Sequence, residues 1–550
     1  MSTADEAAPR ATPSSGRQAA YAIVARVLAA RTHAADELAE LRSTGALPPR
    51  EAALAMELAL GVLRHTVTLG HVLGSLAKFD EHRSPAALRA ILWVGAYQLI
   101  WMDRIPAYAA VDDAVSAARA RVGAGAGRLV NAVLRNVGRA IAAQRVAWQR
   151  GDARQVRVSW ADACAFDRAV LPAVCDAETP ARARRAAHSA ECGAAASERS
   201  EPGWRHLAAA TASRPARYRE LVERFGFEAA EQIAWASQAP PATVLQRHAL
   251  RIDEHAFEQR VRDEFGEAAE FAEGAAFLPA GVGGGRSTLL ADGVAYVQDA
   301  TARAAANLLA PQPGERVLDL CAAPGGKSVT LALAMHDRGE IVAADASADR
   351  LARLAQMIAR LGLRCVTPRQ ISPDNAIVEW ASGDAAQSGD ERLSVDADSA
   401  RGSSPERTPT SSGSARRAPP RDAGPDDAAR SGDVRPPGFD AVLVDAPCTN
   451  TGVLARRPEA RLTFSRQKLE ALAAIQRRLL RQAAAQVRPG GRLVYSTCSL
   501  EPEENAEQIV TFLGDHADWR MGREQLTLPR WGPSAADWCD GGYAALLRRG

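Results

Sequence analysis

The spacing of apolar residues divides the chain into a helical part and an alternating part. Over residues 16–143, apolar positions such as Leu54, Leu58 and Val62 recur every three or four residues, which is the period of an amphipathic helix. No strand-type alternation interrupts this region, and Pro106 marks a break between two helices. We therefore predict an all-helical bundle here.

From residue 296 to residue 550, short apolar runs alternate with helical patterns. Strands are predicted at 316–320, 340–345, 440–444 and 491–496, and helices at 326–336, 348–361, 466–487 and 503–514. This alternation is typical of an α/β domain with a parallel-rich sheet, in which ligands bind at the carboxyl ends of the strands. The predicted fold class is multidomain: the bundle, a small α+β unit over 214–295, and a Rossmann-like α/β domain.

Three segments lack a clear pattern. Residues 1–15 form a polar tail that we expect to be disordered, and residues 144–213 are expected to be a linker or insertion with some helix. The segment 385–437 contains neither aromatic residues nor isoleucine, so it cannot bury enough surface to offset its ordering entropy. We predict a disordered insertion within the α/β domain. In the small unit, strands are expected at 242–245 and 295–297 and a helix at 257–265.

Composition adds little about partners. The chain has 67 Lys and Arg against 65 Asp and Glu, so its overall charge favours no class of partner. The basic residues are almost all arginine, and the three lysines are Lys78, Lys327 and Lys468. A lysine retained at position 327 against this bias hints at a specific role.

The eight cysteines form no C-x-x-C pair, so we expect no metal site and interpret Cys164, Cys175 and Cys192 as incidental thiols. Neither a signal peptide nor an apolar run long enough to span a membrane stands out. We expect a monomeric cytoplasmic protein with no membrane partner. Reduced thiols would then be free for chemistry.

The segment Val317–Ser328 has the layout of strand, glycine-rich turn and helix. Backbone N–H groups at such a helix start face a ligand, and Gly325 and Gly326 let a cofactor approach the backbone. A phosphate-binding loop is the weaker interpretation, because Cys321 occupies the place of that motif's first glycine.

Two aspartates follow further strands. Asp345 ends the second strand about 20 residues beyond the glycine turn, where nucleoside-binding domains carry a ribose-binding carboxylate. Asp384 is placed where a third strand would end, and its carboxylate is a candidate to accept a hydrogen bond from an adenine amino group.

Two cysteines follow the last two predicted strands. Asp445 and Cys448 lie in D-A-P-C-T-N-T-G, and Cys498 lies in Y-S-T-C-S. Cytosine C5 is a poor nucleophile, but addition of a thiolate at C6 makes C5 able to attack an electrophilic methyl group. An acid at N3 promotes the addition, and a base later removes the C5 proton. Asp445 and the two cysteines supply these groups.

The motifs of the second half resemble those of the Fmu/Sun family of RNA cytosine-C5 methyltransferases: LDLCAAPGGKS (318–328), DAPCTNTG (445–452), RPGGRLVYSTCS (488–499) and EPEEN (501–505). The resemblance implies Cys498 as nucleophile, Cys448 as base or helper in product release, and Asp445 as the cytosine N3 contact. It also implies that S-adenosylmethionine is bound by Cys321, Ala322, Ala323, Pro324, Gly325, Gly326, Lys327, Asp345, Asp384 and Asp445.

The first half resembles the NusB family of RNA-binding helical domains. The resemblance rests on GVLRH (61–65), on residues 91–115 and on RLVNAVLRNV (128–137). It implies RNA contact, whereas Tyr97, Gln98 and Asn131 fit a helical core better. The candidates for phosphate contact are Arg17, Arg64, Arg128 and Arg135. A NusB-like region in front of the catalytic motifs implies 16S ribosomal RNA as the partner.

Some positions depart from the Fmu/Sun pattern. Asn450 stands where a small residue is usual, the segment 456–462 lacks the usual Lys-Trp, and the terminal motif reads D-G-G-Y-A at 540–544. Two alternatives stay open: a cytosine methyltransferase acting on transfer RNA or DNA, the DNA type using Cys448 as nucleophile, or a non-catalytic RNA-binding assembly factor.

Overall fold

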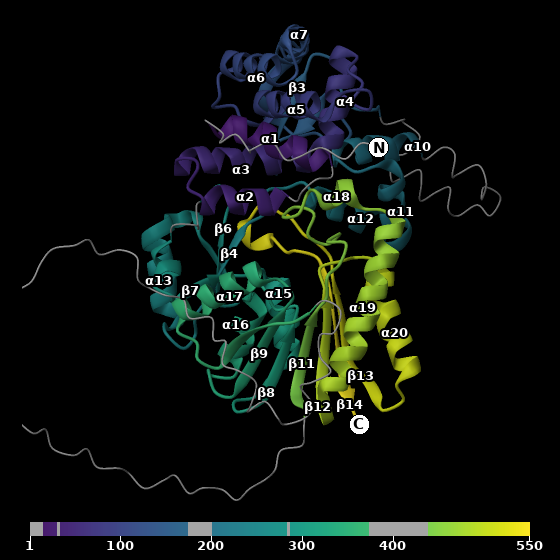
Figure 1. Cartoon of the computed structure of the whole chain (residues 1–550). Coiled ribbons are helices and arrows are strands. Elements are labelled where there is room, and N and C mark those ends of the chain that lie inside the picture. Colours follow the sequence, from purple (N-terminus) through teal and green to yellow (C-terminus); the bar gives the residue numbers. More distant parts are fainter. Residues whose placement is uncertain (1–14, 30–33, 174–200, 283–286, 373–437) are drawn as a thin grey trace, which may run out of the picture.

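The computed structural model describes residues 15–29, 34–173, 201–282, 287–372 and 438–550, with the helical part stacked on one end of the α/β part (Figure 1). The predicted insertion at 385–437, the candidate residue Asp384, and Cys175 and Cys192 lie outside these residues, as does the predicted tail except for Ser15.

The N-terminal region is the helical bundle that the periodicity predicts. Its central helix, α5, is apolar on nearly every side and is buried among the others. The helices are α1 (Gly16–Leu28), α2 (Ala34–Ser43), α3 (Pro49–Arg64), α4 (Thr66–Ala77), α5 (Ala86–Trp101), α6 (Ala107–Arg121) and α7 (Ala124–Ala140).

None of the described helices is by itself both long enough and apolar enough to cross a membrane. The pair α3 and α4 passes that test only when taken together, with a bend of 76° between the two helices. Leu58, Val62, Leu69 and Val72 of this pair are buried in the core of the bundle.

The prediction of a linker at 144–213 is wrong for the residues directly after the bundle. Strands β1 (Ile141–Ala147), β2 (Gln155–Arg157) and β3 (Asp162–Phe166) form an antiparallel three-stranded sheet in the order β1-β3-β2. The strands are short and rich in Ala, Gln and Arg, so their sequences lack the alternation of apolar and polar residues that would predict a strand. Cys164 and Phe166 pack into the helical core, and burial raises the pKa of the Cys164 thiol to about 12.

The next region contains the strands and the helix that the sequence predicts. An antiparallel sheet has the order β5-β6-β4-β7, and α13 packs beside it. The elements are α10 (Glu201–Ala210), α11 (Pro215–Phe225), α12 (Phe227–Ala236), β4 (Thr243–Arg247), α13 (Glu254–Phe265), β5 (Glu270–Ala272), β6 (Ala275–Leu278), α14 (Thr288–Ala291) and β7 (Ala295–Val297).

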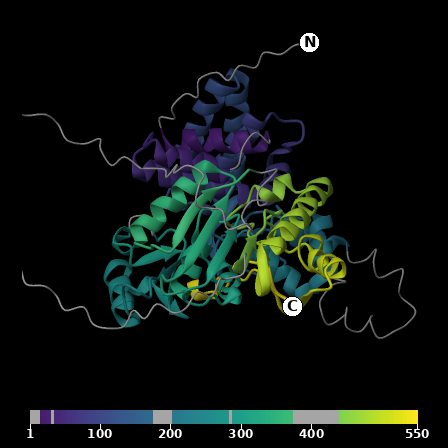
Figure 2. The ribbon, with the colours of Figure 1, turned by 60° about the horizontal axis from the view of Figure 1, so that its bottom comes forward.

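The C-terminal region is built on a sheet of seven strands in the order β10-β9-β8-β11-β12-β14-β13. Figure 2 shows this region with its bottom turned forward. The first five strands pair in parallel, whereas β14 pairs antiparallel with β12 and β13. The strands are β8 (Arg316–Leu320), β9 (Glu340–Asp345), β10 (Val366–Gln370), β11 (Phe439–Asp445), β12 (Val487–Thr497), β13 (Trp519–Thr527) and β14 (Gly542–Arg549).

Helices cover both faces of this sheet because adjacent strand residues point to opposite sides. Val317 packs with the helices of one face and Leu318 with those of the other. The first face carries α15 (Ala300–Leu309), α16 (Gly326–Ala334) and α17 (Ala348–Leu361), and the second carries α19 (Arg466–Gln486) and α20 (Ala506–Asp515). The structure thus confirms the predicted helices, with small shifts at their ends.

Arg157 of β2 joins three regions that are distant in the sequence. Its guanidinium carbon lies 4.1 to 4.8 Å from the ring centroids of four tryptophans: Trp148, Trp160, Trp235 and Trp531. Trp148 lies between β1 and β2, Trp160 lies between β2 and β3, Trp235 belongs to α12, and Trp531 precedes β14. A planar cation among aromatic faces is a favourable arrangement, so this cluster fixes the helical part on the α/β part.

We predict that Arg157→Ala lowers the free energy of unfolding by about 2–4 kcal/mol, because it removes cation–π contacts and leaves a gap among four rings. Urea unfolding followed by tryptophan fluorescence measures the change. The neighbouring Arg154, whose side chain is 62% exposed, provides the control, and Arg154→Ala should change stability by less than about 0.5 kcal/mol. Equal effects of the two variants would contradict a role of the cluster.

Candidate active site

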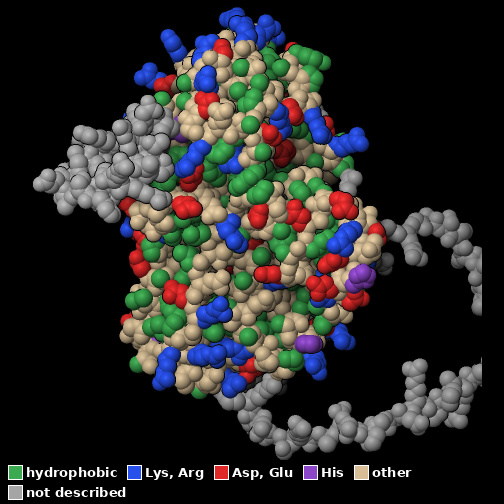
Figure 3. All heavy atoms as spheres, turned by 180° about the vertical axis from the view of Figure 1, so that it is seen from behind, with side chains coloured by type: hydrophobic (Ala, Val, Ile, Leu, Met, Phe, Trp, Pro, Cys, Tyr) green, Lys and Arg blue, Asp and Glu red, His purple; other side chains and the backbone are tan. Residues whose placement is uncertain are grey.

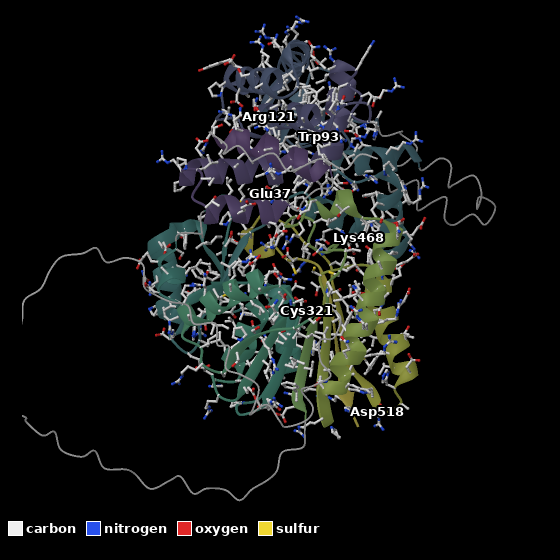
Figure 4. The ribbon with its side chains drawn as sticks, in the orientation of Figure 1. Glu37, Trp93, Arg121, Cys321, Lys468 and Asp518 are labelled. Carbon is white, nitrogen blue, oxygen red and sulfur yellow. The ribbon has the colours of Figure 1, made fainter. Side chains whose placement is uncertain are left out.

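The glycine turn lies at the carboxyl end of β8. Figure 4 shows Cys321, the first residue of the turn, at the end of the sheet that is nearer to the helical part. Cys321 has φ +62°, and Gly325, which precedes α16, has φ +107°. A Cβ atom on Gly325 would lie 2.8 Å from Leu354 Cγ, so both the backbone angle and the packing of α17 require glycine. The turn can therefore bring its backbone close to a ligand.

Asp345 ends β9 as predicted and is almost fully buried. Its Oδ2 accepts a hydrogen bond from Ala323 N at 3.1 Å, and its Oδ1 accepts one from Ser347 N at 2.9 Å. The Arg350 guanidinium lies 3.6 Å from the same carboxylate. Asp345 thus connects the glycine turn to the second strand.

Asp319 is a buried acid within β8 to which the sequence reasoning gave no role. Its Oδ2 accepts from Ser328 Oγ at 2.6 Å, whereas its Oδ1 has no hydrogen-bond partner within the described residues. Burial raises the pKa of Asp319 to about 7, against the opposing effect of the Ser328 hydrogen bond. The signal in the sequence is an acidic residue inside an otherwise apolar strand.

Lys327 and Asp445 form an ion pair, with 2.8 Å between Lys327 Nζ and Asp445 Oδ2. Lys327 stands in the first turn of α16, and Asp445 ends β11. Burial acts to lower the pKa of Lys327, but the Asp445 carboxylate outweighs it, so the pKa is raised. Ser496 Oγ donates to the other oxygen of Asp445 at 3.1 Å. The pair therefore holds a proton donor next to a carboxylate at the strand ends.

The two predicted cysteines meet beside this pair. Cys448 lies in the loop after β11, Cys498 directly follows β12, and their Sγ atoms are 3.2 Å apart. The pKa of Cys448 is raised well above its ordinary value, first because of its hydrogen bond with Cys498 and then because of burial. While Cys498 is a free thiol or thiolate, Cys448 therefore retains its proton more strongly than an ordinary cysteine.

Asn450 bridges the two cysteines, a role that the sequence reasoning missed. Cys498 Sγ donates to Asn450 Oδ1 at 3.2 Å, and Asn450 Nδ2 donates to Cys448 O at 3.0 Å. The residue has φ +62°, a backbone conformation that asparagine adopts more readily than most residues. Its departure from the family pattern was the only sign in the sequence.

A cavity opens beside Cys498. It is lined by Lys327, Asp445 and Cys498 and by residues of α15, β13 and β14, including Thr301, Gln525 and Tyr543. Arg456, whose side chain is 30% exposed, donates to Asp299 and to Asp540, two acids that line the cavity. Burial raises the pKa of Asp540 to about 7, although the Arg456 charge acts in the opposite direction. The cavity thus brings Cys498 and the Lys327–Asp445 pair together in one place.

The loop that carries Cys448 is closed by a tight contact between two glycines. Gly541 N donates to Gly452 O at 2.8 Å, and Gly452 N donates to Cys498 O at 2.9 Å. A Cβ atom on Gly452 would lie 2.7 Å from Gly541 C and 2.9 Å from Cys498 O. Any side chain here would therefore displace backbone next to Cys498.

The prediction that Arg64 contacts phosphate is wrong. Arg64 is buried, and its Nε donates to Ala455 O at 2.8 Å, in the loop that follows Cys448. Helical periodicity predicts which residues share a face, but not that the end of α3 packs against the catalytic region. Arg17, another candidate for phosphate contact, forms a hydrogen bond within the bundle: its Nε donates to Gln98 Oε1 at 2.7 Å. Gln98 itself is buried, as the core interpretation predicts.

Arg128 and Arg135 are exposed on α7, so their predicted contact with RNA stays a prediction. Lys and Arg side chains gather over this end of the helical part (Figure 3). Strand β10, next to β9, ends at Gln370, well before Asp384 in the chain, and Asp384 lies outside the described residues. The third strand therefore ends earlier than the sequence reasoning placed it.

Comparison with known proteins agrees with this geometry. The model of the family described as "16S rRNA methyltransferase RsmB/F" matches residues 306–388 and 425–531, and the NusB family model matches residues 14–139. The ribosomal RNA small subunit methyltransferase B of Xanthomonas campestris is 30% identical and is matched over 98% of its length and 96% of this chain. That of Sodalis glossinidius is also 30% identical, over 90% of each chain.

A crystal structure titled PH0851 has the same fold, with a TM-score of 0.62, 18% identity and coverage of 97% of this chain and 99% of that chain. Fold and site together define an S-adenosylmethionine-dependent methyltransferase with a NusB-type helical region in front. Within that class, the chain belongs to the ribosomal RNA small subunit methyltransferase B family.

We predict that Gly452→Ala lowers the methylation rate by at least about tenfold, roughly 1.4 kcal/mol of barrier, because its methyl group would displace the backbone of Cys498. Binding of S-adenosylmethionine, measured by calorimetry, should change little. Gly514→Ala is the control, since a Cβ atom there meets nothing within 4 Å. A Gly452→Ala enzyme with normal activity would show that this contact does not hold the site.

Proposed function

We propose that this protein methylates C5 of a cytosine in 16S ribosomal RNA through a covalent bond between Cys498 and C6 of the base. The observation that carries the proposal is the contact of Cys498 and Cys448 at 3.2 Å, beside the Lys327–Asp445 pair in one cavity. The relatives are named as methyltransferases of small-subunit ribosomal RNA, which supports this substrate.

The residues around the glycine turn fit S-adenosylmethionine. The cofactor, when bound, supplies an electrophilic methyl group. The turn from Cys321 to Lys327 offers backbone without bulky side chains, and Asp345 stands where ribose hydroxyls would donate to a carboxylate. Asp319 Oδ1, which has no hydrogen-bond partner in the described part of the chain, is a further buried acceptor next to the turn. Asp384 remains a proposed contact to the adenine amino group.

Cys498 and the Lys327–Asp445 pair share the first half of the reaction. The Cys498 thiolate forms a bond to C6 of cytosine while N3 takes a proton from the pair, so C5 becomes an enamine carbon. C5 then accepts the methyl group. The pair is suited to this because Lys327 retains its proton through its contact with Asp445.

Cys448 acts in the second half. The hydrogen bond with Cys498 and the negative charge of the Cys498 thiolate are among the causes that raise the pKa of Cys448. Both effects are lost once the Cys498 sulfur is bonded to C6. Cys448 can then lose its proton to solvent, and the resulting thiolate is the base that takes the C5 proton. The electrons of that C–H bond re-form the C5–C6 double bond, the C6–S bond breaks, and the Cys498 thiolate and the N3 proton return to their starting places.

We predict opposite phenotypes for the two cysteines. Cys498→Ala should abolish methyl transfer and any adduct with 5-fluorocytosine RNA, because it removes the attacking sulfur. Cys448→Ala should still form the adduct with unmodified RNA but release the product slowly or not at all. Denaturing gels detect the adduct, and transfer of a tritiated methyl group to unmodified 16S RNA measures turnover.

Transfer RNA and DNA serve as substrate controls in the same assay. Loss of the adduct in Cys448→Ala, with Cys498→Ala active, would overturn the assignment and favour a mechanism of the DNA type. Preferred methylation of transfer RNA would overturn the substrate, and the absence of methyl transfer to any of the three would indicate a binding factor.

We further propose that α7 contacts the RNA backbone through Arg128 and Arg135, which lie on its exposed face. Replacing both by glutamine should weaken RNA binding and lower the slope of log K against log salt by about 1 per lost phosphate contact. Filter binding at several salt concentrations measures this slope. Arg364→Gln is the control, since its side chain is 90% exposed on the α/β part. An unaltered slope in the double variant would show that α7 does not hold the RNA.

A further inference from the structure

The catalytic loop requires an external support, because Cys448 belongs to neither a helix nor a strand. The residues on both sides of Cys448, Pro447 and Thr449, form backbone hydrogen bonds with the side chains of Gln476 and Glu504. Gln476 Nε2, on α19, donates to Pro447 O at 2.8 Å, and Thr449 N donates to Glu504 Oε1 at 2.9 Å. Glu504 ends a short 3₁₀ helix, Pro502–Glu504, that follows β12.

Glu504 is the acceptor on which this support converges. Its carboxylate has no exposed surface and receives the backbone N–H of Thr449, the Thr449 hydroxyl, and Gln476 Nε2 at 3.0 Å. No ion pair found within the described residues includes Glu504. An ionised carboxylate accepts several hydrogen bonds and donates none, so it suits these three donors, two from Thr449 in the loop and one from Gln476 on α19.

The same short segment also holds Cys498. Tyr495 Oη, on β12, donates to Glu504 O at 2.7 Å, and Asn505 Nδ2 donates to Ser499 O at 2.9 Å. Thr497 Oγ1 donates to Asn505 Oδ1 at 2.6 Å. Residues 504 and 505 thus connect the strand end that carries Cys498 to the loop that carries Cys448.

Charge adds a second effect to this geometry. Burial raises the pKa of Glu504, while hydrogen bonds from Ser499, Thr449 and Gln476 act in the opposite direction. Its negative charge is one of the causes that raise the pKa of Cys448, after the effects of Cys498 and of burial. The carboxylate therefore helps Cys448 to stay a neutral thiol beside the nucleophile.

We propose that Glu504 is a positioning residue for product release: through Thr449 and Gln476 it holds the Cys448 thiol against Cys498. The proposal rests on the role proposed above for Cys448. It assigns a task to the third glutamate of the E-P-E-E-N motif, whose carboxylate accepts hydrogen bonds from Thr449 and Gln476 and so acts on Cys448 through the loop.

Glu504→Gln is the informative substitution because it conserves shape. The amide offers one acceptor oxygen and turns its N–H donors toward groups that are donors themselves, so the loop loses at least one hydrogen bond. The adduct should still form within about threefold of the wild-type rate, and product release should slow by about tenfold, as for about 1.4 kcal/mol of lost stabilisation. Single-turnover assays with unmodified RNA separate the two steps.

Glu503→Gln is the matched control. Glu503 lies next to Glu504 on the same short helix, but its carboxylate forms an ion pair with Arg466 at 2.7 Å and is 24% exposed. This variant should form and release the adduct at wild-type rates. Thermal melting and calorimetric binding of S-adenosylmethionine show whether each variant is folded.

A double variant distinguishes positioning from a general loss of stability. In the Cys448→Ala background, Glu504→Gln should slow release no further, because the group that it positions is already absent. An additional tenfold slowing there would mean that Glu504 acts through something other than Cys448 and would overturn the proposal. Normal release by the Glu504→Gln single variant would also overturn it.

Thr449→Val provides a second route if Glu504→Gln does not fold. It removes the hydroxyl that donates to Glu504 and retains the backbone N–H, so release should slow in the same direction but by less. Normal release by Thr449→Val would then decide against the proposal. The proposed function fails separately: if Cys448→Ala itself releases product normally, the role of Cys448 is wrong, whereas a trapped Cys448→Ala adduct with normal release by Glu504→Gln rejects only the inference about Glu504.

Discussion

The chemistry of this protein depends on the parallel pairing of β11 with β12. Asp445 is the partner of Ser496 in that ladder, so both strands end at the same level and Cys498 emerges beside the loop that follows Asp445. A register shift of one residue would turn each side chain to the other face of the sheet and separate the two sulfurs. The two strands lie at the centre of the sheet, where neighbours on both sides fix that register.

The loop beyond Cys448 is also where the helical part meets the catalytic part. Arg64, at the end of α3, donates to Ala455 O, and Arg461 donates to the carbonyl oxygens of Arg64, Ala212 and Ser237. Burial, together with the charge of Arg64, lowers the pKa of Arg461 to about 10. At this junction, arginine side chains that bind backbone carbonyls hold segments that are distant in the sequence in one fixed arrangement. The helical part is therefore a structural support of the catalytic loop as well as the proposed RNA-binding surface.

Local sequence signals determined much of the α/β part. The strands at 316–320 and 340–345 and the helix at 348–361 have the predicted bounds, because buried parallel strands are short apolar runs and the helix carries a regular apolar face. Chain order then placed the glycine turn, Asp345, Asp445 and both cysteines at strand ends. Right-handed connections bring those ends to one edge of the sheet, so the composition of the site followed from the order of its motifs.

Tertiary structure alone decided the contacts between segments that are far apart in the chain. Hydrophobic period shows which face of an element is buried but not what packs on it, so Arg64 was interpreted as a surface residue although it lies at an interface. The strands β1 to β3 have no apolar period of their own, because much of their burial comes from packing on the bundle and around Arg157. Asn450 and Glu504 acquire their roles only when the Cys448 loop folds against the end of β12, since a hydrogen bond between distant segments leaves no periodic signal in either of them.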